Sequence, residues 1–199
     1  MRVIAGSFKG RQLAAASTAN LRPTTNRVKE AWASSLGSLS GGLEGLRVLD
    51  AFAGSGALGI ELLSRGASYC LFCEWDGASL VALRQNLAAL GLASDVAPIA
   101  KLDSFSADLL KRLKGASPLD VVILDPPYDL SPEKVKGLLR GLGRAGYVRN
   151  QTLISYEHDG RKPAALDGLV LCSACSPAAL HLALSKSYGR IHLDYYRCH

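Results

Sequence analysis

From residue 46 onward the chain alternates between short apolar segments typical of buried strands and longer segments with a helical repeat. Strands are predicted at 46–52, 68–74, 96–100, 119–125 and 152–158, and helices at 56–66, 77–91, 104–115 and 132–143. This alternation predicts an α/β fold with a mostly parallel sheet covered by helices on both faces. Two further strand-like segments, 181–187 and 190–196, predict an antiparallel hairpin at one edge of the sheet.

The first 45 residues follow a different pattern. Residues 2–13 predict a short basic β-hairpin around a Ser-Phe-Lys turn that is bounded by two glycines. An amphipathic helix follows, which Thr24 or Thr25 is expected to cap and Gly37 to end. The face predicted to be buried comprises Val28, Ala31, Trp32, Ser35 and Leu36.

The net charge of +6 is concentrated near the N-terminus. The chain has 23 basic and 17 acidic side chains. Residues 1–30 hold six basic side chains and one acidic one, which leaves 17 basic and 16 acidic side chains for residues 31–199. The six are Arg2, Lys9, Arg11, Arg22, Arg27 and Lys29. Such an arm is typical of proteins that bind nucleic-acid phosphates, although a solvated terminal face has the same charge. We expect an RNA-contacting extension, 1–40, ahead of a main domain, 41–199.

Composition excludes several classes of protein. Apolar residues make up 48% of the chain and charged residues 20%, which supports a packed core and argues against a disordered chain. No apolar run approaches the eighteen or so residues of a membrane span. The N-terminus lacks the pattern of a signal peptide. We therefore expect a cytoplasmic protein that does not bind a membrane.

Four of the five cysteines form two CxxC pairs, Cys70/Cys73 and Cys172/Cys175. Such pairs can bind zinc. However, the first pair lies in a predicted strand, where a three-residue offset points the side chains to opposite faces. The pairs are also about a hundred residues apart, far from the usual zinc spacing. We expect buried structural thiols and no metal.

The turn after the first strand contains three glycines, Gly54, Gly56 and Gly59, in a GxGxxG pattern. Glycines at this place let the backbone approach a ligand closely. Alone, the pattern also fits a nicotinamide cofactor or an ordinary tight turn. Asp50 ends the strand and favours a cationic ligand such as S-adenosylmethionine, because a dinucleotide would present a negative pyrophosphate instead.

Acidic and aromatic residues end the second strand. Glu74 lies about 20 residues after the first glycine of the turn, where a carboxylate accepts hydrogen bonds from ribose hydroxyls in such sheets. Trp75 follows and could pack on an adenine, although a core aromatic is an equally good interpretation from composition.

The sequence Asp125-Pro126-Pro127-Tyr128 ends the fourth strand, at the same edge of the sheet. Two prolines fix the backbone and donate no N–H, so the loop presents a carboxylate beside an uncovered carbonyl. Both accept hydrogen bonds from an amino group, and the ring of Tyr128 can stack on the base that bears it. A structural strand-ending turn is the alternative.

In this order the motifs VLDAFAGSGALG and DPPY resemble motifs I and IV of the class I N-methyltransferases, which have a Rossmann-like sheet. The N-terminal segments RVIAGSFKGRQL and LRPTTNRVKEAW, together with ISYEH and KSYG…HLDYY, resemble the bacterial RsmD-type family over essentially the whole chain. The resemblance implies methyl transfer from S-adenosylmethionine to N2 of a guanine in 16S ribosomal RNA. The implied partner is the 30S subunit or an assembly intermediate, and we expect a monomer.

The resemblance also implies site residues. The cofactor would be held by Asp50, Phe52, Gly54, Ser55, Gly56, Glu74 and Trp75. Asp125, Pro126, Pro127 and Tyr128 would hold the target base, and Arg2, Lys9, Arg11, Arg22, Thr24, Thr25 and Arg27 would contact RNA. Such enzymes often have an acidic residue followed by a small one after the third strand. This chain reads Ala-Lys-Leu-Asp there, so Asp103 is assigned to the adenine with a shift of one or two positions.

The implied mechanism needs neither a metal nor a covalent enzyme intermediate. Asp125 and the Pro126 carbonyl would accept the amino protons of guanine and free the nitrogen lone pair for in-line attack on the methyl group. Four alternatives stay open: a DNA adenine or cytosine N-methyltransferase, a protein-glutamine methyltransferase, a non-catalytic RNA-binding assembly factor, and a nicotinamide-dependent oxidoreductase. The basic arm and the small size favour RNA over the first two.

Overall fold

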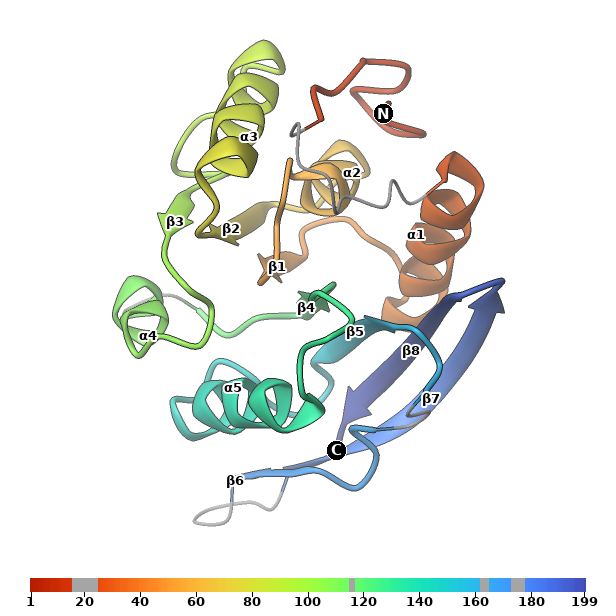
Figure 1. Ribbon diagram of the computed structural model, residues 1–199, viewed down its shortest axis with the longest axis vertical. Coiled ribbons are helices and arrows are strands. Elements are labelled where there is room, and N and C mark those ends of the chain that lie inside the picture. The colour runs from red at the N-terminus through yellow and green to blue at the C-terminus, as the bar shows by residue number, and fades with distance from the viewer. Residues whose placement is uncertain (16–24, 115–116, 162–164, 173–177) are drawn as a thin grey trace.

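The computed structural model describes residues 1–15, 25–114, 117–161, 165–172 and 178–199 (Figure 1). These residues form one eight-stranded sheet in the order β3-β2-β1-β4-β5-β8-β7-β6. The strands are β1 (Arg47–Asp50), β2 (Tyr69–Glu74), β3 (Ile99–Lys101), β4 (Val121–Leu124), β5 (Leu153–His158), β6 (Val170–Cys172), β7 (Ala178–Tyr188) and β8 (Ile191–Cys198).

The sheet has a parallel part and an antiparallel part. Strands β3, β2, β1, β4 and β5 are parallel, as the alternating pattern predicts. The hairpin of β7 and β8 joins them through antiparallel pairing of β8 with β5. Strand β6 was not predicted: it has three residues and its pairing with β7 shifts in register, so only the neighbouring strand marks it as a strand.

Helices cover both faces of the sheet (Figure 1). They are α1 (Asn26–Ser40), α2 (Ala57–Ser64), α3 (Gly77–Ala89), α4 (Asp108–Leu113) and α5 (Pro132–Arg144). One buried cluster joins α1, α2 and α3 to one face, and a second cluster joins α4 and α5 to the other. Strand side chains alternate between these clusters: Val48 belongs to the first and Leu49 to the second. The Rossmann-like arrangement expected from the sequence is confirmed.

Helix α1 differs from its prediction at the C-terminal end. Its N-cap is Thr25, whose side chain accepts the Val28 N–H at 3.3 Å. The helix continues past Gly37 to Ser40, because the residue with left-handed geometry is Gly41, at φ 76°. The predicted end at Gly37 is therefore wrong. Gly37 instead contributes its carbonyl to the cap, where it accepts the N–H groups of Gly41 and Gly42.

The N-terminal residues form a shorter hairpin than predicted, with a single β-bridge between Arg2 and Gln12 in place of two paired strands. They are attached to α2 by Glu61, whose carboxylate accepts the backbone N–H groups of Ile4 and Ala5 at 2.9 and 3.1 Å. The same carboxylate lies 3.2 Å from the ammonium of Lys29, and both side chains are fully buried. Lys29 is therefore part of the structure rather than of a basic surface, unlike Arg2, Lys9, Arg11 and Arg27, which are exposed.

Cys70, Cys73 and Cys198 are buried free thiols, which is consistent with structural cysteines. Cys70 and Cys73 are buried on opposite faces of β2, as predicted, and burial raises the pKa of both thiols. Cys175 lies outside the described residues. Within the described ranges, no helix combines the length and the apolar character that crossing a membrane requires.

Candidate active site

Four acidic side chains stand in a row at the carboxyl ends of neighbouring strands. In spatial order β2-β1-β4-β5, they are Glu74, Asp50, Asp125 and Glu157. Two residues before the first three lie Phe72, Val48 and Ile123, whose side chains pack in the cluster with α1, α2 and α3. Two residues before Glu157 lies Ser155, which is hydrogen-bonded to Trp32 of α1, so by alternation all four carboxylates face the same side. We call them the carboxylate row. The sheet topology therefore brings together the three acidic positions singled out in the sequence and adds a fourth, Glu157.

Asp50 is the most buried member of the row, with 1% of the residue exposed. One oxygen, Oδ2, accepts the Gly59 N–H at 3.1 Å. The other, Oδ1, is buried and has no hydrogen-bond partner among the described residues. Burial raises the pKa of Asp50 to about 7, the Gly59 hydrogen bond opposes the shift, and the Glu74 carboxylate adds to it. A cationic ligand beside Oδ1 would satisfy this oxygen and favour its charged form.

The glycine turn between β1 and α2 places its backbone close to the row. Gly54 and Gly56 have φ of 54° and 85°, which favours glycine at both positions. A Cβ on Gly59 would lie 2.4 Å from the ring of Phe72, so α2 can pack this closely only with glycine there. A Cβ on Gly54 would have no other atom within 4 Å. The backbone is thus exposed to a ligand at Gly54 and packed against the sheet at Gly59.

Glu74 ties this turn to the start of α3. Its Oε2 accepts the Gly54 N–H at 2.8 Å, and its Oε1 accepts the N–H groups of Trp75 and Asp76 at 2.7 and 2.8 Å. The carboxylate is held by three backbone donors and stays half-buried. Trp75 beside it is 72% exposed, so the interpretation as a core aromatic is wrong. Its ring is available to a flat ligand.

The remaining predicted cofactor residues lie around the same turn. Ser55 is buried, and its carbonyl accepts the side-chain amide of Asn86 at 2.8 Å. Phe52 packs against Phe105, with ring centroids 5.7 Å apart. Asp103 is exposed and caps its own loop by accepting the Phe105 N–H at 3.0 Å. Phe105, from the loop after β3, joins this group without having been predicted, because only the fold brings its ring to Phe52.

The DPPY loop lies at the far end of the row from Glu74. Pro126 is buried and Pro127 is exposed. The hydroxyl of Tyr128 donates to Oε1 of Glu157 at 2.9 Å. The backbone carbonyl of Tyr128 accepts a hydrogen bond from the guanidinium of Arg161 at 3.3 Å. The loop is thereby fastened to the end of β5 by both the side chain and the backbone of Tyr128.

Asp125 lies in surroundings that disfavour its charge. Burial raises its pKa well above the usual value, and the carboxylates of Glu157 and Asp50 raise it further. Asp125 and Glu157 line one small cavity together with Val28 and Trp32 of α1. Trp32 is 2% exposed and donates its indole N–H to Ser155 at 2.8 Å. The predicted amphipathic helix thus forms an apolar wall of the site, a role that its pattern alone did not reveal.

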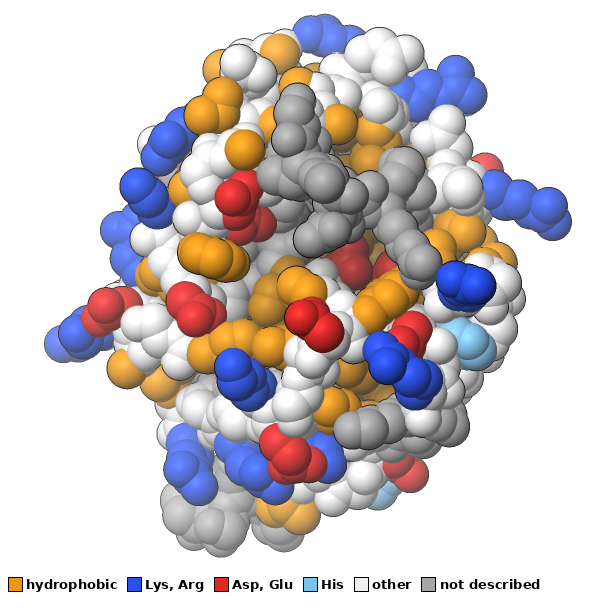
Figure 2. All heavy atoms as spheres, viewed as in Figure 1, with side chains coloured by type: hydrophobic (Ala, Val, Ile, Leu, Met, Phe, Trp, Pro, Cys, Tyr) orange, Lys and Arg blue, Asp and Glu red, His pale blue; other side chains and the backbone are white. Residues whose placement is uncertain are grey.

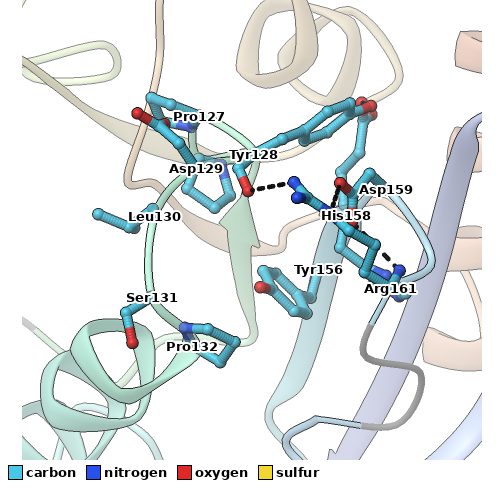
Figure 3. Close-up of a pocket in the computed structure, with 12 residues that line it drawn as sticks. Pro127, Tyr128, Asp129, Leu130, Ser131, Pro132, Tyr156, His158, Asp159 and Arg161 are labelled. Carbon is cyan, nitrogen blue, oxygen red and sulfur yellow. Dashed lines mark hydrogen bonds and ion pairs between the residues drawn. The ribbon is translucent and has the colours of Figure 1, made fainter.

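A cleft of about 280 Å³ opens beside the DPPY loop (Figure 3). The loop forms one wall and the end of β5 the other. Arg161 reaches across from the second wall to the carbonyl of Tyr128, and its side chain also pairs with Asp159 (Figure 3). Tyr156 and His158 stack in the second wall with ring centroids 5.3 Å apart. The space can accept a flat, partly apolar group between the DPPY loop and the end of β5. Asp125 itself does not line this cleft but the small cavity beside α1.

Most of the basic residues predicted to contact RNA are accessible. Arg2, Lys9, Arg11, Thr25 and Arg27 are all exposed. Arg11 donates to the carbonyl of Ala89 at 2.6 Å, which links the hairpin to the end of α3. Arg22 and Thr24 lie outside the described residues. On the face that Figure 2 shows, Lys and Arg side chains stand mostly around the rim, with acidic and hydrophobic side chains towards the centre.

Comparisons with known proteins agree with this arrangement. The "ribosomal RNA small subunit methyltransferase D" of Escherichia coli K12 is 38% identical over 163 residues, 80% of this chain and 75% of that protein. The protein of the same name from Haemophilus influenzae is 34% identical over 82% of this chain and 81% of its own length. A solved Escherichia coli structure, yhhF, provisionally named a methyltransferase, superposes with a TM-score of 0.73 and 27% identity, covering 100% of this chain and 97% of its own.

The fold extends to more distant proteins. A magnesium protoporphyrin IX methyltransferase from Synechocystis, solved with bound S-adenosylmethionine, has a TM-score of 0.61 at 15% identity and covers 85% of this chain and 78% of its own. The family model described as "conserved hypothetical protein 95" matches residues 1–197. With this match and the two curated relatives, the chain belongs to that family, which includes the ribosomal RNA small subunit methyltransferase D proteins.

Proposed function

We propose that this protein transfers a methyl group from S-adenosylmethionine to the exocyclic N2 of a guanine in 16S ribosomal RNA, acting in the cytoplasm as a monomer. The reaction class, S-adenosylmethionine-dependent methylation of ribosomal RNA, follows from membership of the family. The guanine N2 target, the small subunit as substrate and the residue assignments go further. The observation that carries the residue assignments is the carboxylate row, which sets Asp125 of the DPPY loop at the end of β4, the strand next to that of Asp50. The small subunit as substrate is proposed from the names of the relatives.

The cofactor half of the site fits S-adenosylmethionine. The buried Oδ1 of Asp50, which lacks a partner among the described residues, suits a cationic group. Glu74 retains acceptor capacity for ribose hydroxyls, since a carboxylate offers about four lone-pair sites and backbone donors occupy three. Trp75 and Asp103 would contact the adenine, while Phe52, Gly54, Ser55 and Gly56 would border the rest of the cofactor. When bound, S-adenosylmethionine supplies the methyl group of its sulfonium, and the rest of the cofactor becomes a neutral thioether.

The DPPY loop would prepare the acceptor nitrogen. The lone pair of a guanine amino group is delocalised into the ring and is a poor nucleophile. Asp125 and the Pro126 carbonyl would accept hydrogen bonds from its two N–H groups and favour a pyramidal nitrogen. The nitrogen lone pair then forms the new N–C bond as the methyl–sulfur bond breaks, and the nitrogen loses one proton. Pro127 keeps the loop rigid and Tyr128 would stack on the base. In its ionised form Asp125 would take the one proton that the nitrogen loses, and burial, which raises its pKa, favours the protonated carboxyl that results.

The N-terminal extension would deliver the RNA. In this proposal residues 1–40 contact the phosphates through Arg2, Lys9, Arg11, Arg22 and Arg27, with Thr24 and Thr25 at the start of α1, while residues 41–199 hold the cofactor. Wall residues of α1 line the cavity beside Asp125, so the extension is packed close to the acceptor site. A base that enters this site must leave its stack, which favours a target in a loop or unpaired strand.

The test is methyl transfer from radiolabelled S-adenosylmethionine to 30S subunits that lack their own modification, with naked 16S RNA and DNA as parallel substrates. We expect label on the subunit or its RNA, recovered as N2-methylguanine at one site. Label on a different base or atom would contradict the guanine N2 assignment. Label on DNA alone would remove the ribosomal assignment, and cofactor binding without transfer to any substrate would indicate a non-catalytic protein.

A further inference from the structure

We infer that Glu157 determines which base the enzyme accepts: its carboxylate receives the N1–H of the target guanine while Asp125 receives the neighbouring amino group. The inference rests on the proposed function, because it names what recognises the base that the reaction modifies. Glu157 lies in the ISYEH segment that carries the family resemblance but outside motifs I and IV, and the sheet topology brings it to the DPPY loop.

The register of β4 and β5 places the two carboxylates side by side. The strands are parallel, with Leu124 paired to Tyr156. The next residues are Asp125 and Glu157, and alternation turns both side chains to the face that carries α1. Both line the cavity bounded by Val28 and Trp32. Adjacent strands lie about 4.8 Å apart, so the two carboxyl groups can approach neighbouring atoms on one edge of a base.

The hydrogen bond from Tyr128 orients Glu157. The phenol donates to Oε1 at 2.9 Å, and 8% of the glutamate is exposed. A carboxylate can accept several hydrogen bonds at once, so the bond from Tyr128 is compatible with a further one from a base. Because the same tyrosine would stack on the base, the residue that holds the ring also fixes the carboxylate that would read its edge.

Base chemistry explains why a second carboxylate is useful here. Guanine presents two adjacent donors, N1–H and the N2 amino group, and therefore suits a pair of acceptors. In adenine and cytosine the ring nitrogen next to the amino group, N1 or N3, carries a lone pair and no hydrogen. It would therefore face the buried carboxylate of Glu157 without donating a hydrogen bond to it. A polar group left unpaired inside a site is costly, so a site built for N1–H rejects bases that lack it.

The experiment compares guanine with 2-aminopurine at the target position of an rRNA substrate. Both bases offer the N2 amino group, but N1 of 2-aminopurine is an acceptor. We expect the wild-type kcat/KM to favour guanine by on the order of 100-fold, the range of a lost charge-assisted hydrogen bond. In Glu157→Gln the side-chain amide can donate to N1 of 2-aminopurine, so this preference should fall by about tenfold or more.

Two further variants keep the test decisive. Glu133→Gln makes the same chemical change at an exposed position in the first turn of α5 and should leave the preference unchanged. Glu157→Asp retains the carboxylate, so it should lose activity yet still prefer guanine, and it serves if Glu157→Gln does not fold. Cofactor affinity and thermal unfolding are measured for each variant to identify loss of structure.

The outcomes separate this inference from the proposed function. If Glu157→Gln lowers kcat/KM equally for both bases, Glu157 has a structural role and the inference is wrong, while methylation of guanine by the wild-type enzyme still stands. If Glu157→Gln does not fold and Glu157→Asp loses the preference for guanine, the inference is also wrong. If the wild-type enzyme modifies no guanine in rRNA, both fail together. A fall in the preference, with cofactor affinity unchanged, supports Glu157 as the residue that determines specificity.

Discussion

The part of the site proposed to bind the cofactor, here called the cofactor half, and the part proposed to bind the base, the base half, hold their carboxylates differently. In the cofactor half, backbone N–H groups within a few residues of the motifs hold Asp50 and Glu74. In the base half, Asp125 lies among side chains from distant elements, including Trp32 of α1 and Glu157 of β5. The carboxylates of the first half are therefore held by the turns that follow β1 and β2, whereas the second half also needs β5 and α1.

This contrast predicts that changes in the two halves separate cofactor binding from catalysis. The largest effect is expected in the base half. Asp125→Ala should lower methyl transfer by about 10³-fold, because it removes the main acceptor for the amino protons. Cofactor affinity, measured by calorimetry, should stay within a few-fold of wild type. A fully active variant would show that the DPPY loop does not have the role we assign to it.

The corresponding change in the cofactor half is Asp50→Asn. It removes a charge while keeping the shape and the Gly59 hydrogen bond, so cofactor affinity should fall by about 10- to 100-fold. The free protein should become more stable at pH 8, because ionising a buried carboxyl group opposes folding. Calorimetry and thermal unfolding measure the two effects. Tighter cofactor binding by this variant would contradict a cationic group at Oδ1.

The pH dependence of binding tests the same group without mutation. The folded-state pKa of Asp50 is raised to about 7, so its contribution to stability is fully present below the unfolded pKa of about 3.9 and is lost as pH rises through 7. A cationic ligand prefers the ionised form, so affinity should weaken by up to about tenfold for each pH unit below 7. Thermal unfolding with and without cofactor, between about pH 5.5 and 8, measures this change in affinity. Asp50→Asn should have a flatter profile.

The smallest effect is expected at Trp75. Because its side chain is 72% exposed, Trp75→Ala should leave the free protein about as stable as wild type. Stacking of an aromatic ring on a flat ligand contributes about 0.5–1.5 kcal/mol, so cofactor affinity should fall roughly 2- to 10-fold. Equilibrium binding of S-adenosylmethionine gives the answer. Unchanged affinity would mean that the ring does not contact the adenine and that Asp103 or the backbone holds it.

The same contrast explains which sequence predictions succeeded. The strands and glycine turn were predictable because strand burial and backbone geometry depend on neighbouring residues. The end of α1 was predicted at Gly37 but lies at Ser40. The neighbouring sequence does not distinguish a glycine inside a helix from a glycine that ends one. Lys29 was counted with the basic arm, although its charge is buried against Glu61, 32 positions further along the chain.

By itself, the sequence determined the α/β class, the reaction implied by the Asp50 and DPPY motifs, and the basic character of the N-terminus, because each depends on residue type and short spacing. Only the tertiary structure decided that four carboxylates form one row, that α1 lines the cavity with Asp125, and that Glu157 stands beside Asp125. The reason is that parallel strands meet at one edge whatever their separation in sequence, and strand order and register set which side chains meet there.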